Sequence, residues 1–350
     1  MRALSKTVLL VSAVVLAVGL ALHGLALAQS QPQLLAAYRP APLPLTDPTA
    51  PLWAELTGQT VPLTAQAGVA PALPQASIAS VDVKAVHDGQ WIVFLLSWPD
   101  ATQDMGASRL DDFPDAAAVE VAPAAGVPSI CMGLVGQQLN LWHWKASWQK
   151  DLDDGFQEVV QAYPNFWGDF YPYVVGKPPF HFPQDWQSPE ARALVPAWEA
   201  GNPLANPKRV TAVEDLNAEG FGTLTTQTTQ DVLGRGVWKD GRWYVTFART
   251  LATSDANDSQ LAPGDSRSVA FAVWNGSNRE AGARKQLSSW ATLAVEKAQA
   301  AAPSPAPVQA AAPAPTVSSV GGPFVAGVGV MAALALAVLM IVAGARGRET

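Results

Sequence analysis

The amino-acid sequence predicts an all-β protein, an antiparallel β-sandwich over residues 76–297. Three observations favour this class. Short apolar runs recur at the spacing of hairpins. Two of them are interrupted by Asp-Gly, at Asp88-Gly89 and Asp240-Gly241, the residue pair that two-residue hairpin turns prefer. The chain also holds 13 tryptophans but only 15% charged residues, which implies a thick aromatic interior or a large flat ligand.

The predicted strands follow these signals in order. The hairpins span Ala79–Asp100 and Arg235–Thr250, and they share the spacing of Asp-Gly, Trp, Val and Phe, so a weak internal duplication is possible. The stretch QWIVFLLSW in the first hairpin is apolar almost throughout, as expected of a strand that is buried on both faces. Further strands are predicted at Ala116–Pro123, Gln137–Trp148, Phe221–Gly234, Ser268–Ser277 and Ser288–Glu296.

Two segments depart from the strand pattern. Residues 29–75 are rich in proline and predict an extended N-terminal arm wrapped on the domain. Residues 151–210 form a long insertion dense in aromatic residues and prolines, with a short helix predicted at Ser188–Glu199. Such an insertion is either a functional lid or a loop packed for stability.

The two ends of the chain predict an export signal and a membrane anchor. Residues 1–28 have a basic start, an apolar run and a small-x-small cleavage site, so they read as a signal peptide, with an uncleaved anchor as the alternative. Residues 298–322 form an Ala/Pro-rich linker. Residues 323–345 match one transmembrane helix, and arginines in the tail, 346–350, are expected to stay cytoplasmic. The sequence thus predicts a single-pass protein of the cell membrane with its bulk on the extracytoplasmic side.

Composition argues against several classes of function. The net charge is −7 and no basic run occurs, which argues against nucleic-acid binding. Cys131 is the only cysteine, so an intramolecular disulfide and cysteine-based zinc sites are excluded. No histidine lies in a hydrolase motif, and no CxxCH motif is present to attach a haem covalently.

One stretch concentrates atoms that can bind a metal. SICMGLVGQQLNLWHWKASW (Ser129–Trp148) holds Met132, His143 and Lys145. On a strand, His143 and Lys145 share one face, while Trp142 and Trp144 share the other.

With these motifs in order, the chain resembles the haem-binding domain of the ethylbenzene dehydrogenase γ-subunit family from about Pro51 to Glu296. Six motifs carry the resemblance: VDVKAVHDGQWIVFLLSW, FPDAAAVEVAP, SICMG, LNLWHWKASW, GVWKDGRWYVTFARTL and VAFAVWNGSNREAGARKQLSSW. The resemblance implies a β-sandwich with one non-covalent haem b. It implies an electron-transfer subunit without its own substrate site, beside an iron–sulfur subunit and a molybdopterin catalytic subunit of the nitrate, nitrite, chlorate or hydrocarbon type. Small redox carriers are the alternative partners.

The resemblance also implies that a methionine and a lysine bind the haem iron. Carried onto this sequence, the methionine is Met132, and the lysine is Lys239 in VWKDGRW, with His143 as the alternative. Lys145 is then expected to contact a haem propionate. The aromatic faces of Trp142 and Trp144 suit the apolar face of the porphyrin. A haem-free, tryptophan-rich sandwich that binds carbohydrate or another ligand is the competing interpretation.

Overall fold

The structure is a computed structural model, and it describes residues 33–40, 42–128, 132–165, 185, 188–189, 192, 196–202, 205–206 and 209–298. The chain divides into two compact units, Met1–Ala300 and Ala301–Thr350, and all described residues belong to the first. The predicted signal peptide, the transmembrane segment 323–345 and the tail lie outside the described residues, as does the linker from residue 299 onward. Among the helices that the structure describes, none is both long and apolar enough to cross a membrane.

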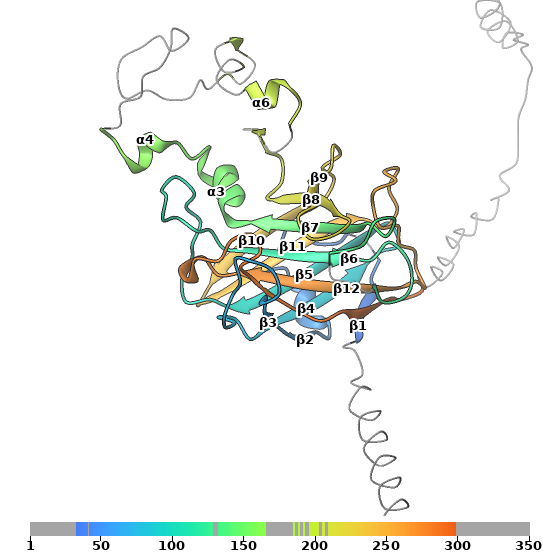
Figure 1. The fold of residues 1–350 in the computed structure, drawn as a ribbon. Coiled ribbons are helices and arrows are strands. Elements are labelled where there is room, and N and C mark those ends of the chain that lie inside the picture. The colour runs from blue at the N-terminus through green and yellow to red at the C-terminus, as the bar shows by residue number, and fades with distance from the viewer. Residues whose placement is uncertain are drawn as a thin grey trace, which may run out of the picture. The chain divides into compact units, whose positions relative to one another are not determined.

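The regular secondary structure of the described residues is mostly β, with 14 strands joined in one curled sheet (Figure 1). The sheet order is β10-β11-β5-β4-β1-β14-β12-β6-β7-β8-β9, while β2 pairs with β4, and β13 pairs with both β12 and β3. The strands are β1 (Gln33–Tyr38), β2 (Gln59–Pro62), β3 (Thr64–Ala65), β4 (Ser80–His87), β5 (Trp91–Pro99), β6 (Ala116–Val121), β7 (Leu139–Lys145), β8 (Val213–Ala218), β9 (Thr225–Thr226), β10 (Leu233–Lys239), β11 (Arg242–Thr250), β12 (Ser266–Trp274), β13 (Gln286–Leu287) and β14 (Ala291–Val295). The short helices are α2 (Leu52–Glu55), α3 (Ala146–Asp154), α4 (Val159–Ala162), α6 (Pro196–Glu199) and the 3₁₀ turn η2 (Gly276–Asn278).

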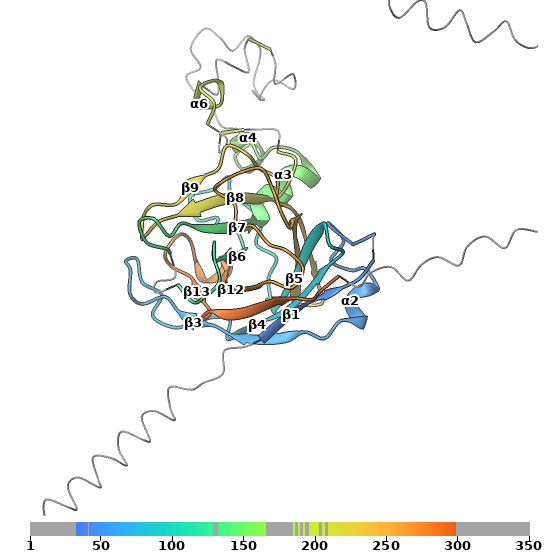
Figure 2. The same cartoon turned by 90° about the vertical axis from the view of Figure 1, so that its right-hand side faces the viewer.

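The predicted class is confirmed as mostly β, but the arrangement of the strands corrects the prediction of a purely antiparallel sandwich. Strand β1 pairs in parallel with β14 on one side and with β4 on the other. It comes from the segment predicted to be a wrapped arm. The backbone of β1 thus joins the part of the sheet from β10 to β4 to the part from β14 to β9. Its side chains Leu34 and Ala36 are buried. Figure 2 shows the sheet curling from β1 and β4 round to β7, β8 and β9.

Both predicted hairpins are confirmed, as β4–β5 and β10–β11. The strand predicted through Trp148 ends at Lys145, where helix α3 begins. Phe221–Gly234 was predicted as one strand, yet it holds only β9 and the first residues of β10. Strand β8 was not predicted, because its sequence VEDLNA is acidic although all six residues are buried. One of its carboxylates, that of Glu214, forms an ion pair with Lys145 of β7, a contact that the local pattern does not reveal.

The interior between β7 and the strands β5 and β11 is aromatic, as the tryptophan content predicts. Trp144 of β7 packs edge-on against Trp98 of β5 and Trp243 of β11, with ring centroids 6.4 and 4.9 Å apart. Trp142, also on β7, meets Phe94 of β5 in the same way at 5.8 Å. These rings are fully buried. Trp142 and Trp144 therefore fill the core, and the residues on the opposite face of β7 point away from it.

Candidate functional site

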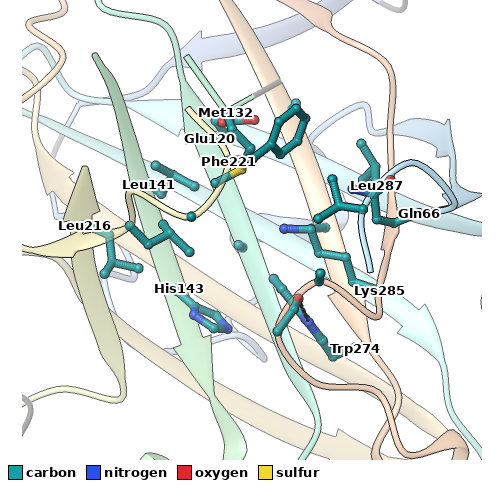
Figure 3. Close-up of a pocket in the computed structure, with 18 of the residues that line it drawn as sticks. Gln66, Glu120, Met132, Leu141, His143, Leu216, Phe221, Trp274, Lys285 and Leu287 are labelled. Carbon is teal, nitrogen blue, oxygen red and sulfur yellow. Dashed lines mark hydrogen bonds between the residues drawn. The ribbon is translucent and has the colours of Figure 1, made fainter. Parts of the chain in front are cut away.

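A pocket of about 330 Å³ lies on the face of the sheet that points away from this aromatic core (Figure 3). The volume falls within the roughly 300–1,000 Å³ range of small-molecule sites. Its floor is made by alternate residues of four neighbouring strands, and loop residues close over them. The residues that line the pocket include Glu120, Met132, His143, Phe221, Trp274 and Lys285.

The floor of the pocket is formed by small side chains. Ala118 of β6 and Ala270 and Ala272 of β12 line the pocket, and successive side chains of a strand point to opposite faces. Their neighbours Val119, Phe271 and Val273 are buried in the main core. An alanine floor between larger walls leaves a broad space in which a flat apolar ligand can lie against the sheet.

Met132 reaches the pocket from the turn that leads into β7. The next residue, Gly133, has φ +76°, a backbone conformation that favours glycine. A Cβ atom at this position would lie 2.6 Å from the carbonyl oxygen of Ala218, so the turn packs too closely on β8 for any larger residue. This turn directs the Met132 side chain into the pocket, where it is 8% exposed. The turn therefore requires glycine at position 133 of the CMG motif.

His143 lies on the pocket face of β7, as the strand periodicity predicts. Its ring stacks on that of Trp274, with centroids 4.7 Å apart. Burial lowers the pKa of His143 well below its usual range, and the charges of Lys145 and Lys285 act in the same direction. The imidazole is therefore neutral at pH 7. Its Nε2 atom is buried without a hydrogen-bond partner among the described residues, so it can serve as an electron-pair donor.

Lys285 and Glu120 add two charges to this apolar site. The Lys285 side chain extends into the cavity, toward the space bounded by Met132 and His143 (Figure 3). Its Nζ lies 5.0 Å from the centre of the Trp274 ring. Glu120 of β6 is 8% exposed, and its Oε1 atom has no hydrogen-bond partner in the described part of the chain. Burial raises the pKa of Glu120 to about 8, although the charge of Lys285 opposes this shift.

The pocket brings together some of the residues predicted from the sequence and not others. Met132 and His143 line it. Lys145 is on the same strand face but forms an ion pair with Glu214 of β8. Burial lowers the pKa of Lys145, and this ion pair opposes the shift. Lys239 is not among the lining residues: it is the last residue of β10, exposed beside the hairpin turn. The predicted aromatic walls, Trp142 and Trp144, lie on the core side of β7.

Two pocket residues were missed by reasoning from the sequence. Glu120 is the one charged residue in the apolar strand AAAVEV, and an isolated charge in a buried strand was a usable signal. Lys285 lies in a motif that carries the family resemblance, VAFAVWNGSNREAGARKQLSSW. It sits in the irregular segment just before β13, where strand periodicity does not apply.

Comparison with known proteins places this chain in a family. The model of the ethylbenzene dehydrogenase family matches residues 50–286. The chain belongs to this family. The resemblance drawn from the six motifs is therefore confirmed, and the match contains every residue that lines the pocket except Leu287.

Two curated relatives share the matched region. One, from Haloferax mediterranei, carries the provisional name of respiratory nitrate reductase heme subunit ORF7; it is 26% identical over 69% of this chain and 66% of its own length. The match thus spans just under two thirds of that relative. The other, chlorate reductase subunit gamma from Ideonella dechloratans, is 24% identical over 67% of this chain and 72% of its own length.

Among solved structures, similarity is found to carbohydrate-binding proteins. One is a family 9 carbohydrate-binding module from Caldicellulosiruptor kristjanssonii in complex with glucose, with 8% identity, a TM-score of 0.35, and coverage of 76% of this chain and 96% of that one. A Bacteroides uniformis protein, provisionally named as carbohydrate-binding, has 9% identity and a TM-score of 0.37 over 76% of this chain and 100% of that one.

Proposed function

We propose that this member of the ethylbenzene dehydrogenase family is a haem-binding electron-transfer subunit, with one non-covalent haem b in the pocket on β6, β7, β8 and β12. One observation carries the proposal: a thioether and two nitrogen donors, from Met132, His143 and Lys285, line the same apolar pocket. These are donor types that hold haem iron in proteins. The two relatives are named as a heme subunit and a gamma subunit of reductases, and these names support the same role.

The residues of the pocket suit the cofactor on physical grounds. Burying a polar atom without a hydrogen bond costs about 1–3 kcal/mol in proteins, and the pocket holds two such atoms, His143 Nε2 and Glu120 Oε1. A ligand with a metal ion and polar groups would give them partners. The alanine floor offers the apolar contact that a haem without covalent links needs for retention.

We infer that Met132 and Lys285 would hold the haem iron, the lysine in place of Lys239. Lys239 is exposed at a turn, and Lys145 is held by Glu214, whereas the Lys285 side chain points into the cavity (Figure 3). A lysine binds a metal only as the neutral amine, and an apolar pocket disfavours the ammonium form. His143 is the alternative nitrogen donor, because its Nε2 atom is buried in the same pocket.

When bound, the haem would supply one-electron redox chemistry, and a thioether ligand favours its ferrous state. The surrounding residues hold and shield it. Trp274 and Phe221 contribute aromatic surface that excludes water from the pocket. Glu120, with a pKa raised to about 8, is mostly protonated at pH 7 and so adds little net charge to the site.

Haem binding is tested on the purified full-length protein, stripped of haem and titrated with haemin while the Soret band is recorded. We expect one haem per chain and a low-spin spectrum, with a pyridine haemochrome of protohaem. Lys285→Ala should convert the spectrum toward high spin, and Met132→Ala should lower the reduction potential or empty the site. Lys239→Ala and Met105→Ala remove a lysine and a methionine that do not line the pocket, so they are the matched controls and should leave the spectrum unchanged.

The variants also decide between the possible donors. A low-spin spectrum that survives in Lys285→Ala and is lost in His143→Ala would move the nitrogen ligand to His143. Loss in Lys239→Ala alone would restore the lysine predicted from the sequence. A wild-type protein with no Soret band after reconstitution would refute haem binding and favour a haem-free binding module.

We further propose that the subunit exchanges electrons with an iron–sulfur subunit and a molybdopterin catalytic subunit, or with small redox carriers, on the extracytoplasmic side of the cell membrane. The names of the relatives as parts of nitrate and chlorate reductases support the first kind of partner. The uncharged segment 323–345 supports membrane attachment. Purification of a tagged chain from its native membranes should yield the partner subunits. Recovery of the chain alone in the soluble fraction would contradict both parts.

A further inference from the structure

A second polar cluster lies on the other face of β8, away from the haem pocket. Asp215 of β8, Asp231 in the segment before β10, and Asp258 in the loop after β11 each place one carboxylate oxygen within 4.8 Å of the others. Asp215 and Asp258 are buried, and Asp231 is half-buried. Three segments that are distant in the sequence therefore meet at three acids.

The charges in this cluster do not cancel. Three ionised carboxylates carry −3. Among the described residues, the buried cation against them is Arg249, which carries +1 and forms an ion pair with Asp258 at 3.1 Å. The remainder is −2. Asp255 also faces the cluster, and its charge adds to the repulsion on Asp231. Buried charge without compensation is costly, so the site needs either two protons or one divalent cation.

Oxygen atoms in the cluster lack partners, which points to a missing ligand. Asp215 is 0% exposed; its Oδ1 accepts hydrogen bonds from Asn140 and Gln227, but its Oδ2 has no partner among the described residues. The same holds for Oδ1 of Asp231 and for the amide oxygen of Gln227, a side chain only 4% exposed. Because Gln227 Nε2 contacts both Asp215 and Asp258, this third free oxygen belongs to a residue that borders the acids.

We propose that Asp215, Asp231 and Asp258 bind one divalent cation of the hard, oxygen-preferring class that Ca²⁺ represents. Ca²⁺ takes six to eight oxygen ligands in flexible geometry, from carboxylates, amide oxygens and water. Arg249 lies over the Trp142 ring, 4.9 Å from its centre, and donates to Asn140, so the guanidinium is held in place and keeps Asp258 oriented. The cation would fasten β8 to the segment before β10 and to the loop after β11.

Burial shifts the pKa values of two of these acids. It raises the pKa of Asp215 to about 8 and raises that of Asp231, and in both the charge of Asp258 adds to the shift. Burial therefore disfavours the ionised form of both carboxyls when no cation is bound. With a cation they are free to ionise.

The test uses the full-length protein, stripped with EDTA and titrated calorimetrically with CaCl₂ in parallel with thermal melts. We expect one Ca²⁺ per chain and a melting temperature that rises with CaCl₂. Asp231→Asn, chosen because the residue is only half-buried, should weaken Ca²⁺ binding by at least about tenfold and remove the thermal response. Glu219→Gln, which removes one exposed carboxylate beside β8, is the matched control and should bind Ca²⁺ as the wild type does.

Two results would overturn the proposal. The first is a stripped wild-type protein that neither binds Ca²⁺ nor changes its melting temperature, and this result needs no variant to fold. The second is Ca²⁺ binding of equal strength in the wild type and Asp231→Asn, which would assign the ion to another surface. Both readouts are independent of haem, so they also stand apart from the test of electron transfer.

Discussion

Glu120 gives the sharpest test of the pocket's electrostatics. Its carboxyl has a pKa of about 8 in the fold against an ordinary value of 4.5, because burial penalises the ionised form. The folded state therefore binds more protons than the unfolded state between these two values. Stability from this group is fully present below pH 4.5 and is lost as the pH rises through 8. Each pH unit in that window costs about 1.4 kcal/mol.

Replacing Glu120 with Gln removes this dependence while keeping the shape of the side chain. At pH 7, some 2.5 units above the ordinary pKa, the haem-free variant should be more stable than the wild type by about 3 kcal/mol. At pH 5 the same difference should shrink to less than about 1 kcal/mol. The pH dependence of this difference isolates Glu120, because Asp115 and Asp215, whose pKa values are also raised, titrate alike in both proteins.

The measurement is urea denaturation of haem-free wild type and Glu120→Gln at several pH values from 5 to 8.5. Glu219→Gln, at an exposed position, serves as the control and should track the wild type at every pH. A stability difference that stays constant across this range, or a variant that is less stable than the wild type at pH 7, would refute the account of a buried, uncompensated carboxyl.

Three further substitutions probe the packing around the site. Gly133→Ala places a Cβ 2.6 Å from the carbonyl oxygen of Ala218 and should cost about 1–3 kcal/mol in urea denaturation and weaken haemin binding in the Soret titration. Gly236→Ala places a Cβ 2.3 Å from Trp144 Cζ2, in the aromatic core, and should lower the free energy of unfolding by about 1–3 kcal/mol. The folded fraction of this variant should still bind haemin. An unchanged midpoint of urea denaturation would contradict this packing. Ala272→Phe should fill the pocket floor and abolish the Soret band with circular dichroism unchanged, and normal haemin binding would mean that the ligand lies elsewhere.

The central strands and the turn residues could be predicted because their signals are local. The Asp-Gly turns between alternating residues predicted β4–β5 and β10–β11, and the CMG motif directed attention to Met132. Strand β8 escaped prediction because its acidic pattern is typical of an exposed segment, whereas Glu214 is buried in an ion pair with Lys145, which lies far away in the chain. Strand β1 escaped because its place in the sheet depends on β4 and β14, which come later in the chain.

The face on which each side chain lies was the hardest feature to predict. Strand periodicity correctly separated His143 from Trp142 and Trp144, but it did not say which of the two faces holds the ligand pocket. The aromatic face was expected to meet the haem, whereas its rings pack against Trp98, Trp243 and Phe94 in the core. Lys285 comes from an irregular segment whose approach to β6 and β7 is set only by the curl of the sheet.

The sequence by itself determined the mostly-β class, the two hairpins, the aromatic interior and the family, because each depends on local periodicity, turn chemistry or motif order. Only the tertiary structure decided that β1 connects β4 and β14 within one curled sheet, that the pocket lies on the alanine face, and that Lys285 rather than Lys239 reaches it. Those features depend on contacts between residues far apart in the chain, and their geometry follows from how the sheet bends and packs.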